Sequence, residues 1–384
     1  MRFLHVIRSV DPKGGGPIEG LRQRGAVLTE MGMPPEILSA DDPSAEFLRD
    51  FPLKVHAVGP APGTFGRTTA MRDWIRAHHH EYDVVTAHGI WQYPPLAVHA
   101  ALKGTNTPYF VFIHGMLDPW FDLDRVKRLK KQLFWWAGLS SALRDAAFVM
   151  FTTEEERRLA HNRFQPYRVN ERVVAYGTNG APSDLAGPRA VFEQAFPELA
   201  GKPFLLFLSR IHPKKGCDLL VEAFAREYAD SDVFLVLAGP DQVGQQAALE
   251  EQARSLGVFD RVRFVGMLQG ELKWGAYAAC EAFVLPSHQE NFGIVVAEAL
   301  SAGRPALISD KVNIWREVAE GGGGIVAPDD LAGTRELLRR WRETTEVSRA
   351  EMGRRARLVF EEKFSARQSA ESLLAAAREV LGQR

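Results

Sequence analysis

Two acidic residues, Glu290 and Glu298, have the most informative spacing in this chain, with seven residues between them. The apolar run 282–285 before them is typical of a short buried strand, and the residues after Gly293 favour a helix that closes at Gly303. One acid therefore falls in a strand-to-helix loop and the other inside the helix. Helix N-termini attract anions and carboxylates bind hydroxyls, so this segment suits a nucleotide-sugar. Two solvated surface charges are the simpler alternative.

A basic loop follows the apolar run 204–208 and contains Arg210 and Lys215. Arginine offers a planar fork of donors and lysine a point charge, and together they can hold a diphosphate. Taken alone, such a loop is more often simply solvated. The similar strand-loop-helix setting of Glu290 favours the binding interpretation, because both loops then open on one side of a sheet.

The first half of the chain offers weaker candidates. Three glycines at 14–16 follow the first apolar run, and Gly15 and Gly16 would permit close backbone approach to a ligand, although a plain tight turn is an equal alternative. His114 and His88 each follow an apolar run, where a packed, hydrogen-bonded histidine is the simpler interpretation.

Short apolar runs alternate with helical patterns along the whole chain, which predicts an α/β fold with parallel sheets. The expected strands are 3–7, 55–58, 84–86, 110–113, 148–151, 172–174, 204–208, 233–238, 262–264, 283–285 and 306–308. The expected helices are 20–31, 68–79, 94–102, 126–143, 217–228, 245–256, 271–279, 294–302 and 331–344. The Gly- and Pro-rich segment 177–188 predicts a linker between two units.

We therefore expect a first domain over 1–180, a second over 188–364 and a closing amphipathic helix over 365–384. A cleft between two such domains, at the carboxyl ends of their strands, is the expected place for ligands. The formal net charge is −1, which provides no general attraction for nucleic acid. The two cysteines lie in different segments and do not support a disulfide framework. With no signal peptide and no bilayer-spanning run, we expect a cytoplasmic protein or one attached to the inner face of a membrane.

The loop around Arg210 and Lys215, the segment 236–240 and the segment 286–298 together resemble the retaining glycosyltransferases of family 4. The glycine loop and the segments 86–89 and 112–116 fit the same family. The resemblance covers nearly the whole chain. It implies the GT-B fold, in which two Rossmann-like domains face each other across a cleft and the last helix returns to the first domain.

The resemblance implies a role for each matched residue. Arg210 and Lys215 would neutralise the donor diphosphate, Glu298 would accept hydrogen bonds from ribose hydroxyls, and Glu290 would hold sugar hydroxyls. Backbone amides near three residues would touch the sugar and the distal phosphate: Asn291, Phe292 and Gly293. His114 would lie near the reacting sugar, and Gly15 and Gly16 would let the first domain, which binds the acceptor, close on the phosphates of a donor held by the second.

The same resemblance implies that no metal or other cofactor is needed, because Arg210 and Lys215 would take over the neutralising role of a metal ion. Two Asp-x-Asp segments, at 122–124 and 230–232, look like a metal-binding motif. The second lies between a helix and a buried strand, which makes a surface turn the better interpretation.

The segment 125–136 combines basic with aromatic residues, as an interfacial membrane helix does. On a helix, its apolar residues would line one side and its basic residues the others: Val126, Leu129 and Leu133 against Lys127, Arg128, Lys130 and Lys131. A helix with a core-facing apolar side and a solvated basic side is an equally good interpretation. An anionic membrane surface and an anionic lipid-linked acceptor are the partners that the first interpretation implies.

The leading hypothesis is transfer of a hexose from GDP-mannose or a UDP-hexose to a hydroxyl of a saccharide or lipid-linked saccharide. The segments 114–120 and 311–317 are similar to those of family members in bacterial surface-polysaccharide assembly, such as exopolysaccharide or lipopolysaccharide synthesis. Two alternatives stay open: a GT-B nucleotide-sugar epimerase, and a non-catalytic subunit that binds a nucleotide-sugar.

Overall fold

The computed structural model describes residues 1–122 and 124–382 of the chain. The middle residue of the first Asp-x-Asp segment, Leu123, and the last two residues of the expected closing helix lie outside this part. The described chain divides into two compact units, Met1–Thr178 with Ala366–Arg384, and Asn179–Ser365. This division falls inside the predicted linker, although a helix already begins at Ala186. Each unit is described by itself below.

The first unit is built on a seven-stranded sheet in which neighbouring strands are parallel, in the order β3-β2-β1-β4-β5-β6-β7. Its strands are β1 (Phe3–Ile7), β2 (Glu36–Ser39), β3 (Lys54–Ala57), β4 (Val84–His88), β5 (Tyr109–Phe112), β6 (Phe148–Phe151) and β7 (Glu171–Val173). The order reverses between β1 and β4, which we call the first switch point. Ligands of open α/β sheets bind beyond the carboxyl ends of strands at such a point.

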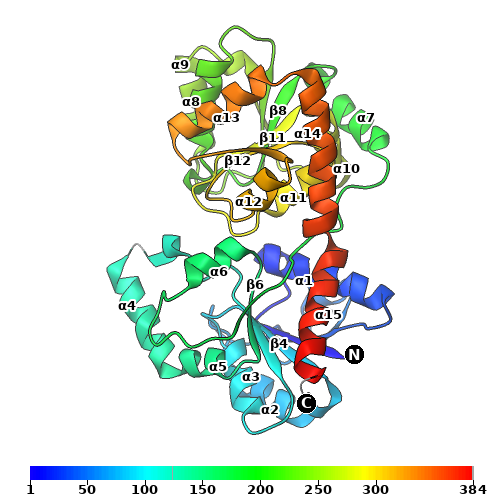
Figure 1. The fold of residues 1–384 in the computed structure, drawn as a ribbon, viewed down its shortest axis with the longest axis vertical. Helices are drawn as coiled ribbons and strands as arrows, with labels where there is room; N and C mark the ends of the chain where they lie inside the picture. Colours follow the sequence, from blue (N-terminus) through cyan, green and yellow to red (C-terminus); the bar gives the residue numbers. More distant parts are fainter. Residues whose placement is uncertain (123, 383–384) are drawn as a thin grey trace. The chain divides into compact units, whose positions relative to one another are not determined.

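Helices cover both faces of this sheet (Figure 1). They are α1 (Gly16–Glu30), α2 (Thr69–His78), α3 (Pro94–Leu102), α4 (Arg125–Phe134), α5 (Ser140–Arg144), α6 (Glu154–Ala160) and α15 (Ala366–Gly382). Buried side chains of α2, α3 and α5 pack on one face, and those of α1 and α15 pack on the other. Leu373 and Leu374 of α15 lie in the same core as Phe3 and Phe110, where each buried leucine contributes roughly 1.5–3 kcal/mol. The closing helix therefore belongs to the first unit.

The second unit repeats the plan with a six-stranded parallel sheet in the order β10-β9-β8-β11-β12-β13. Its strands are β8 (Phe204–Leu208), β9 (Phe234–Ala238), β10 (Val262–Gly266), β11 (Ala282–Leu285), β12 (Ala306–Ser309) and β13 (Gly324–Ala327). The order reverses between β8 and β11, the second switch point. The four β8 residues Phe204–Phe207 and all of β11 are fully buried, as expected for parallel strands with both faces covered.

The helices of the second unit flank its sheet, with α8 beside α13 on one side and α7 beside α10 on the other (Figure 1). They are α7 (Ala186–Ala195), α8 (Cys217–Glu227), α9 (Gln246–Ser255), α10 (Gly270–Ala279), α11 (Ile294–Ser301), α12 (Trp315–Glu320), α13 (Leu331–Glu343) and α14 (Glu346–Val359). The predicted α/β architecture with two Rossmann-like units is confirmed. Both cysteines, Cys217 and Cys280, are buried and free.

The sequence pattern missed some elements and joined others wrongly. The strands β2 and β13 were not predicted, because β2 follows two prolines and β13 follows a run of glycines, which are typical of loops. The single helix expected over 126–143 is wrong. Gly138 adopts a φ of 149° inside a π-helical turn, Trp135–Leu139, and this separates α4 from α5. Only glycine adopts such a backbone without strain.

Candidate functional site

The loops that follow β8 and β11 lie side by side at the second switch point. The two strands are direct neighbours, with Leu205 opposite Ala282, so their carboxyl ends meet at one edge of the sheet. The β8 loop carries Arg210 and Lys215, and the β11 loop carries Glu290. Residues 75 positions apart in the sequence are brought together in this way.

Lys215 and Glu290 form an ion pair at this edge, with Lys215 Nζ donating to Glu290 Oε2. The lysine side chain is only 4% exposed and the glutamate 23%. Gly216 permits the close approach, because a Cβ on this residue would lie 2.3 Å from the carbonyl oxygen of Pro286. Backbone bonds from Glu290 N to Lys311 O (2.9 Å) and from Asn313 N to Glu290 O (3.0 Å) hold the acid in place. The pair therefore presents a cation and an acceptor side by side.

Arg210 is exposed at the same edge. Its Nη1 donates to Gln242 Oε1 over 3.1 Å, which leaves most of the guanidinium donors facing solvent. An exposed arginine of this kind can reorient toward a phosphate without breaking a buried contact. The structure thus brings Arg210, Lys215 and Glu290 to one place.

Glu298 lies in the second turn of α11 and is buried. Its Oε1 accepts from Lys273 Nζ at 2.6 Å, and its Oε2 lies 3.3 Å from the Tyr277 hydroxyl. Burial, and then the adjacent carboxylate, raise the pKa of Tyr277 well above its ordinary value. A carboxylate has about four acceptor positions, so Glu298 keeps capacity for a further hydroxyl.

The residues between the two acids shape the start of α11. Gly293 has a φ of 73° and caps the helix, a conformation that favours glycine. The Phe292 side chain is buried against Phe364, with ring centroids 5.5 Å apart, so only its backbone can face a ligand. Asn291 Oδ1 accepts from Asn313 Nδ2 at 3.4 Å. Backbone contact, as the family resemblance implies for this segment, agrees with this arrangement.

The first switch point carries a cavity of about 350 Å³. Residues that end or follow β1, β4 and β5 line it, among them Gly14, His88, His114 and Met116. Gly15 has a φ of 77° at the start of α1, and the Tyr176 hydroxyl donates to Gly16 O, but neither glycine lines the cavity. The glycine loop therefore lines the cavity at Gly14 and turns beside it at Gly15 and Gly16.

His114 is held in a strained backbone conformation, with a φ of 53°. Its Nε2 lies 2.9 Å from His88 Nδ1, and His88 Nε2 lies 3.0 Å from His5 Nδ1. Burial, and then the Arg24 guanidinium, lower the pKa of both His5 and His114 to about 3. The pKa of His88 is also far below its usual value, because of burial first and then the adjacent His5, His114 and Arg24. All three rings are neutral at physiological pH.

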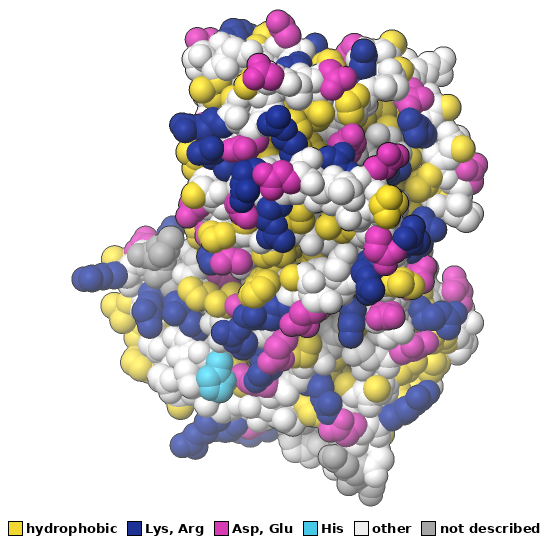
Figure 2. Space-filling view, turned by 45° about the horizontal axis from the view of Figure 1, so that its top comes forward, with side chains coloured by type: hydrophobic (Ala, Val, Ile, Leu, Met, Phe, Trp, Pro, Cys, Tyr) yellow, Lys and Arg dark blue, Asp and Glu magenta, His cyan; other side chains and the backbone are white. Residues whose placement is uncertain are grey.

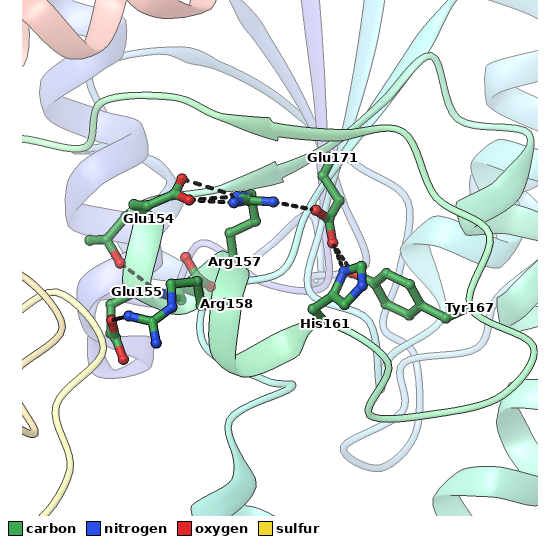
Figure 3. A network of polar contacts seen from close by, with 9 residues as sticks. Glu154, Glu155, Arg157, Arg158, His161, Tyr167 and Glu171 are labelled. Atoms are coloured by element: carbon green, nitrogen blue, oxygen red, sulfur yellow. Dashed lines mark hydrogen bonds and ion pairs between the residues drawn. The ribbon is translucent and has the colours of Figure 1, made fainter.

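Glu156 on α6 fixes the loop that follows His114. Gly115 N donates to Glu156 Oε1, and Thr152 Oγ1 donates to Glu156 Oε2 at 2.7 Å. The outer side of α6 is tied to β7 by Arg157, whose Nη1 donates to Glu171 at 2.8 Å (Figure 3). Arg157 thus fixes the outer side of α6, and the buried Glu156 on its inner side holds the strained turn at His114.

Sequence reasoning missed several of these partners. They are His5, Arg24, Glu156, Lys273 and Tyr277. Each sits inside an ordinary strand or helix pattern, and no motif marks its side chain as part of a polar site. The only signal was a polar side chain at a position where the period requires an apolar one, as in His5 within Phe3–Ile7. Two sets result, one in each unit, and Gly15, Gly16 and His114 belong to the first.

Among residues 1–122 and 124–382, no three His, Cys, Asp or Glu side chains gather as metal ligands would. The prediction that no metal is needed stays a prediction. Within the same residues, no helix combines the length and apolar character that crossing a bilayer requires.

Comparison with known families matches both halves of the chain. Residues 15–177 match the family model for a glycosyl transferase 4-like domain, and residues 189–359 match that for glycosyl transferases group 1. The chain belongs to the family 4 glycosyltransferases.

Individual relatives match a smaller part of the chain than the family models do. The D-inositol 3-phosphate glycosyltransferase of Nocardia farcinica is 31% identical over 223 residues, which cover 53% of this chain and 49% of the relative. The α-D-kanosaminyltransferase of Streptomyces kanamyceticus is 28% identical over a segment that covers 49% of this chain and 48% of the relative. The family 4 chain therefore spans about half the length of the curated relatives it matches.

Solved structures match the family 4 chain over its full length. HepE of Anabaena, in complex with UDP and glucose, has a TM-score of 0.74 at 20% identity, with 100% of both chains covered. Sucrose-phosphate synthase of Thermosynechococcus elongatus has a TM-score of 0.78 at 19% identity, again with 100% of both chains covered. At these identities the likeness shows the fold, which is GT-B.

Proposed function

We propose that this chain transfers a hexose from a nucleoside-diphosphate sugar to a hydroxyl of a saccharide or lipid-linked saccharide, with retention of the anomeric configuration. The meeting of Lys215 with Glu290 and of Lys273 with Glu298, in one unit, carries the proposal. A diphosphate needs cations, and sugar or ribose hydroxyls need acceptors. This edge of the sheet supplies both.

The donor we propose is GDP-mannose or a UDP-hexose. HepE of Anabaena was solved with UDP and with UDP-glucose, which supports a UDP-hexose as the first donor to test. The proposed setting is cytoplasmic assembly of a surface polysaccharide or lipopolysaccharide. WaaG, a glycosyltransferase involved in lipopolysaccharide biosynthesis, shares the fold with a TM-score of 0.63 at 18% identity over 100% of both chains, which supports that setting.

The transferred sugar leaves its diphosphate when the bond from C1 to the phosphate oxygen breaks with oxocarbenium character. Negative charge grows on the leaving phosphate, and Arg210 and Lys215 stabilise it. The acceptor oxygen bonds to C1 on the face that the phosphate leaves, and the acceptor proton passes to the leaving phosphate. No carboxylate acts as a nucleophile.

The resting ion pair adds a step to donor binding. Lys215 is already bound to Glu290, so a diphosphate must compete for the ammonium. As the lysine turns toward the phosphate, Glu290 gains a free oxygen for a sugar hydroxyl. Phosphate binding and sugar binding are coupled through this exchange. A nucleotide without its sugar engages Lys215 but offers no sugar hydroxyl to Glu290.

The test is product analysis with purified protein, a panel of UDP-, GDP- and ADP-sugars, and lipid-linked or free saccharide acceptors. Transfer that requires both donor and acceptor, and that persists in EDTA, is the expected result. Arg210→Ala should lower kcat/KM by about 2–4 kcal/mol in transition-state free energy, whereas the control Arg226→Ala on α8 should not. Epimerised donor without acceptor would identify an epimerase, and donor binding with no transfer would identify a binding subunit.

We further propose that α4 rests on an anionic membrane surface on the cytoplasmic side. In the core-facing alternative the apolar side of α4 would be buried, but α4 has no buried residue and meets the core of the first unit at Phe134, its last residue. Val126, Leu129 and Leu133 are each more than half exposed, as is Trp136 just beyond the helix. Hydrophobic and basic side chains lie together at the left edge of this unit in Figure 2, where α4 lies in Figure 1. Exposed apolar residues beside lysines are typical of interfacial helices.

A further inference from the structure

Three histidines form a continuous hydrogen-bonded row across three neighbouring strands of the first sheet. His5 lies on β1, His88 ends β4 and His114 follows β5, and these strands are adjacent in the sheet. The two nitrogen separations are 3.0 Å and 2.9 Å. The row begins inside the sheet and ends at the cavity of the first switch point.

The rings meet edge to edge, so each contact is a well-directed hydrogen bond. The centroids of His88 and His114 are 5.2 Å apart, which is the nitrogen separation plus roughly the two ring radii, and their planes differ by 16°. Those of His5 and His88 are also 5.2 Å apart, with a tilt of 47°. Phe112 runs parallel to His88, 1° from its plane, and helps to hold that ring.

A row of neutral imidazoles has two directions. Each neutral ring carries one N–H and one lone pair, so the choice at one end sets every other ring. If His5 donates to His88, then His88 donates to His114, and His114 carries its hydrogen on Nδ1. If the row runs the other way, His114 Nδ1 carries a lone pair and His5 Nε2 carries a buried N–H.

The inner end of the row decides the direction. His5 Nε2 is buried and has no hydrogen-bond partner among the described residues. The Arg24 guanidinium lowers the pKa of all three rings and so does not distinguish the two ends of the row, and its own Nη2 is a buried donor without a partner in the described chain. An N–H on His5 Nε2 would be a second buried donor without a partner in the described chain, whereas a lone pair there is the less costly choice, because unpaired buried N–H groups are the rarer kind.

The outer end of the row is accessible. His114 Nδ1 has no hydrogen-bond partner among the described residues, and it is absent from the nitrogens that are buried without one. The ring lines the cavity, and Glu156 holds the amide of the next residue, Gly115. A group at this nitrogen therefore faces a ligand in a fixed position.

We propose that His5 and His88 are positioning residues that hold His114 as the Nδ1–H tautomer, so that His114 donates a hydrogen bond to a sugar hydroxyl in the cavity of the first switch point. The sugar contact rests on the proposed function, whereas the tautomer does not. A ring locked in this form has no lone pair toward the ligand and cannot take the acceptor proton. Proton removal falls to the leaving phosphate.

A matched pair of variants tests the direction of the row. His5→Asn keeps a side-chain N–H near the position of Nδ1, whereas His5→Asp has nearly the same shape and, when ionised beside Arg24, can only accept. The carboxylate should draw the His88 hydrogen to Nε2 and reverse the row. The readout is the tautomer of His114 in the ligand-free protein, from long-range ¹⁵N–¹H correlations of its ring.

The Nδ1–H tautomer is expected in the wild type and in His5→Asn, with kcat/KM within about threefold of each other. His5→Asp should show the Nε2–H tautomer and lose about tenfold in kcat/KM. The same His114 tautomer in wild type and His5→Asp, or Nε2–H in the wild type, would overturn the proposal. If His5→Asp does not fold, His88→Phe gives the same comparison, because His114 should then lose its preference for one tautomer.

Failure of the sugar contact can be told apart from failure of the row. Normal transfer by His114→Ala would contradict the sugar contact but would leave the NMR evidence for the tautomer unaffected. Loss of transfer in His114→Ala, together with equal kcat/KM in the Asn and Asp variants of His5, would instead contradict the positioning role of His5 and His88.

Discussion

The two switch points share a topology and differ in electrostatics. At the second, charged side chains are paired with one another, as Lys215 with Glu290 and Lys273 with Glu298. At the first, three neutral rings lie end to end, and Arg24 is the cation beside them. The strand order places a ligand at the same edge in both sheets, but the side chains that follow the strands decide its chemistry. The paired charges at the second switch point suit an anionic group of a ligand, and the neutral rings at the first suit an uncharged polar group.

The largest expected effect breaks the charged side of this comparison. Lys215→Ala should lower kcat/KM by about 2–4 kcal/mol in transition-state free energy, because the growing phosphate charge loses its buried cation. Glu290 also loses its partner, so a double-mutant cycle with Glu290→Ala should be non-additive by about 0.5–3 kcal/mol. Steady-state kinetics of the two single variants and the double variant measure both terms. Near-normal turnover of Lys215→Ala would show that this edge does not hold the leaving group.

A smaller effect separates the two acids. Glu298→Ala should weaken binding of any sugar on the same nucleotide by about 1–3 kcal/mol, since it removes an acceptor and leaves Lys273 unpaired. Glu290→Ala should instead have an effect that depends on the sugar carried. Calorimetric titration of each variant with UDP and with several UDP-sugars gives the comparison. Equal losses for UDP and for all its sugars in Glu290→Ala would refute the assignment to sugar hydroxyls.

The neutral side of the comparison predicts a pH effect on stability. The folded-state pKa of His5 is about 3, below its ordinary value of 6.5, so the unfolded chain binds a proton that the folded chain does not between these values. Stability from this group is fully present above pH 6.5 and is lost as pH falls toward 3. His5→Asn removes the group, and its loss of unfolding free energy between pH 7.5 and 5.5 should be about 1.4 kcal/mol smaller than that of wild type.

Urea unfolding at the two pH values measures this difference. His80→Ala, at an exposed surface histidine, is the control and should keep the wild-type loss. An equal loss in wild type and His5→Asn would mean that the ring is protonated in the folded protein, which contradicts the neutral row.

The smallest effect of a single residue concerns α4, where the first unit exposes basic charge away from the histidines. Lys127→Gln with Lys130→Gln should weaken binding to anionic vesicles by about 1 kcal/mol per lysine, and binding should fall at high salt. Arg354→Gln with Arg357→Gln on α14 removes the same charge from the second unit and should leave binding unchanged. Co-sedimentation with phosphatidylserine vesicles measures both. Equal loss in both double variants would mean that net charge alone drives the association.

Much of the fold could be predicted because its strands are short, buried and apolar. The run Phe204–Leu208 could be a strand but not a solvent-exposed helix, and the glycines at 216 and 293 are needed by backbone conformations with φ near 70°. The loop residues Arg210, Lys215 and Glu290 followed from their place after such strands. The incorrect predictions were local, as with the helix over 126–143, because the apolar period does not reveal that Gly138 adopts a non-helical φ.

The sequence by itself determined the two parallel sheets, the loops at their carboxyl ends and the family to which the chain belongs, because periodicity and motifs are properties of neighbouring residues. Only the tertiary structure decided that Lys215 binds Glu290, that Lys273 holds Glu298 and that His5 reaches His114 through His88. It also decided that the apolar side of α4 is exposed. These facts depend on which strands become neighbours and on what covers each face, and no local pattern encodes a contact across 75 or 83 positions.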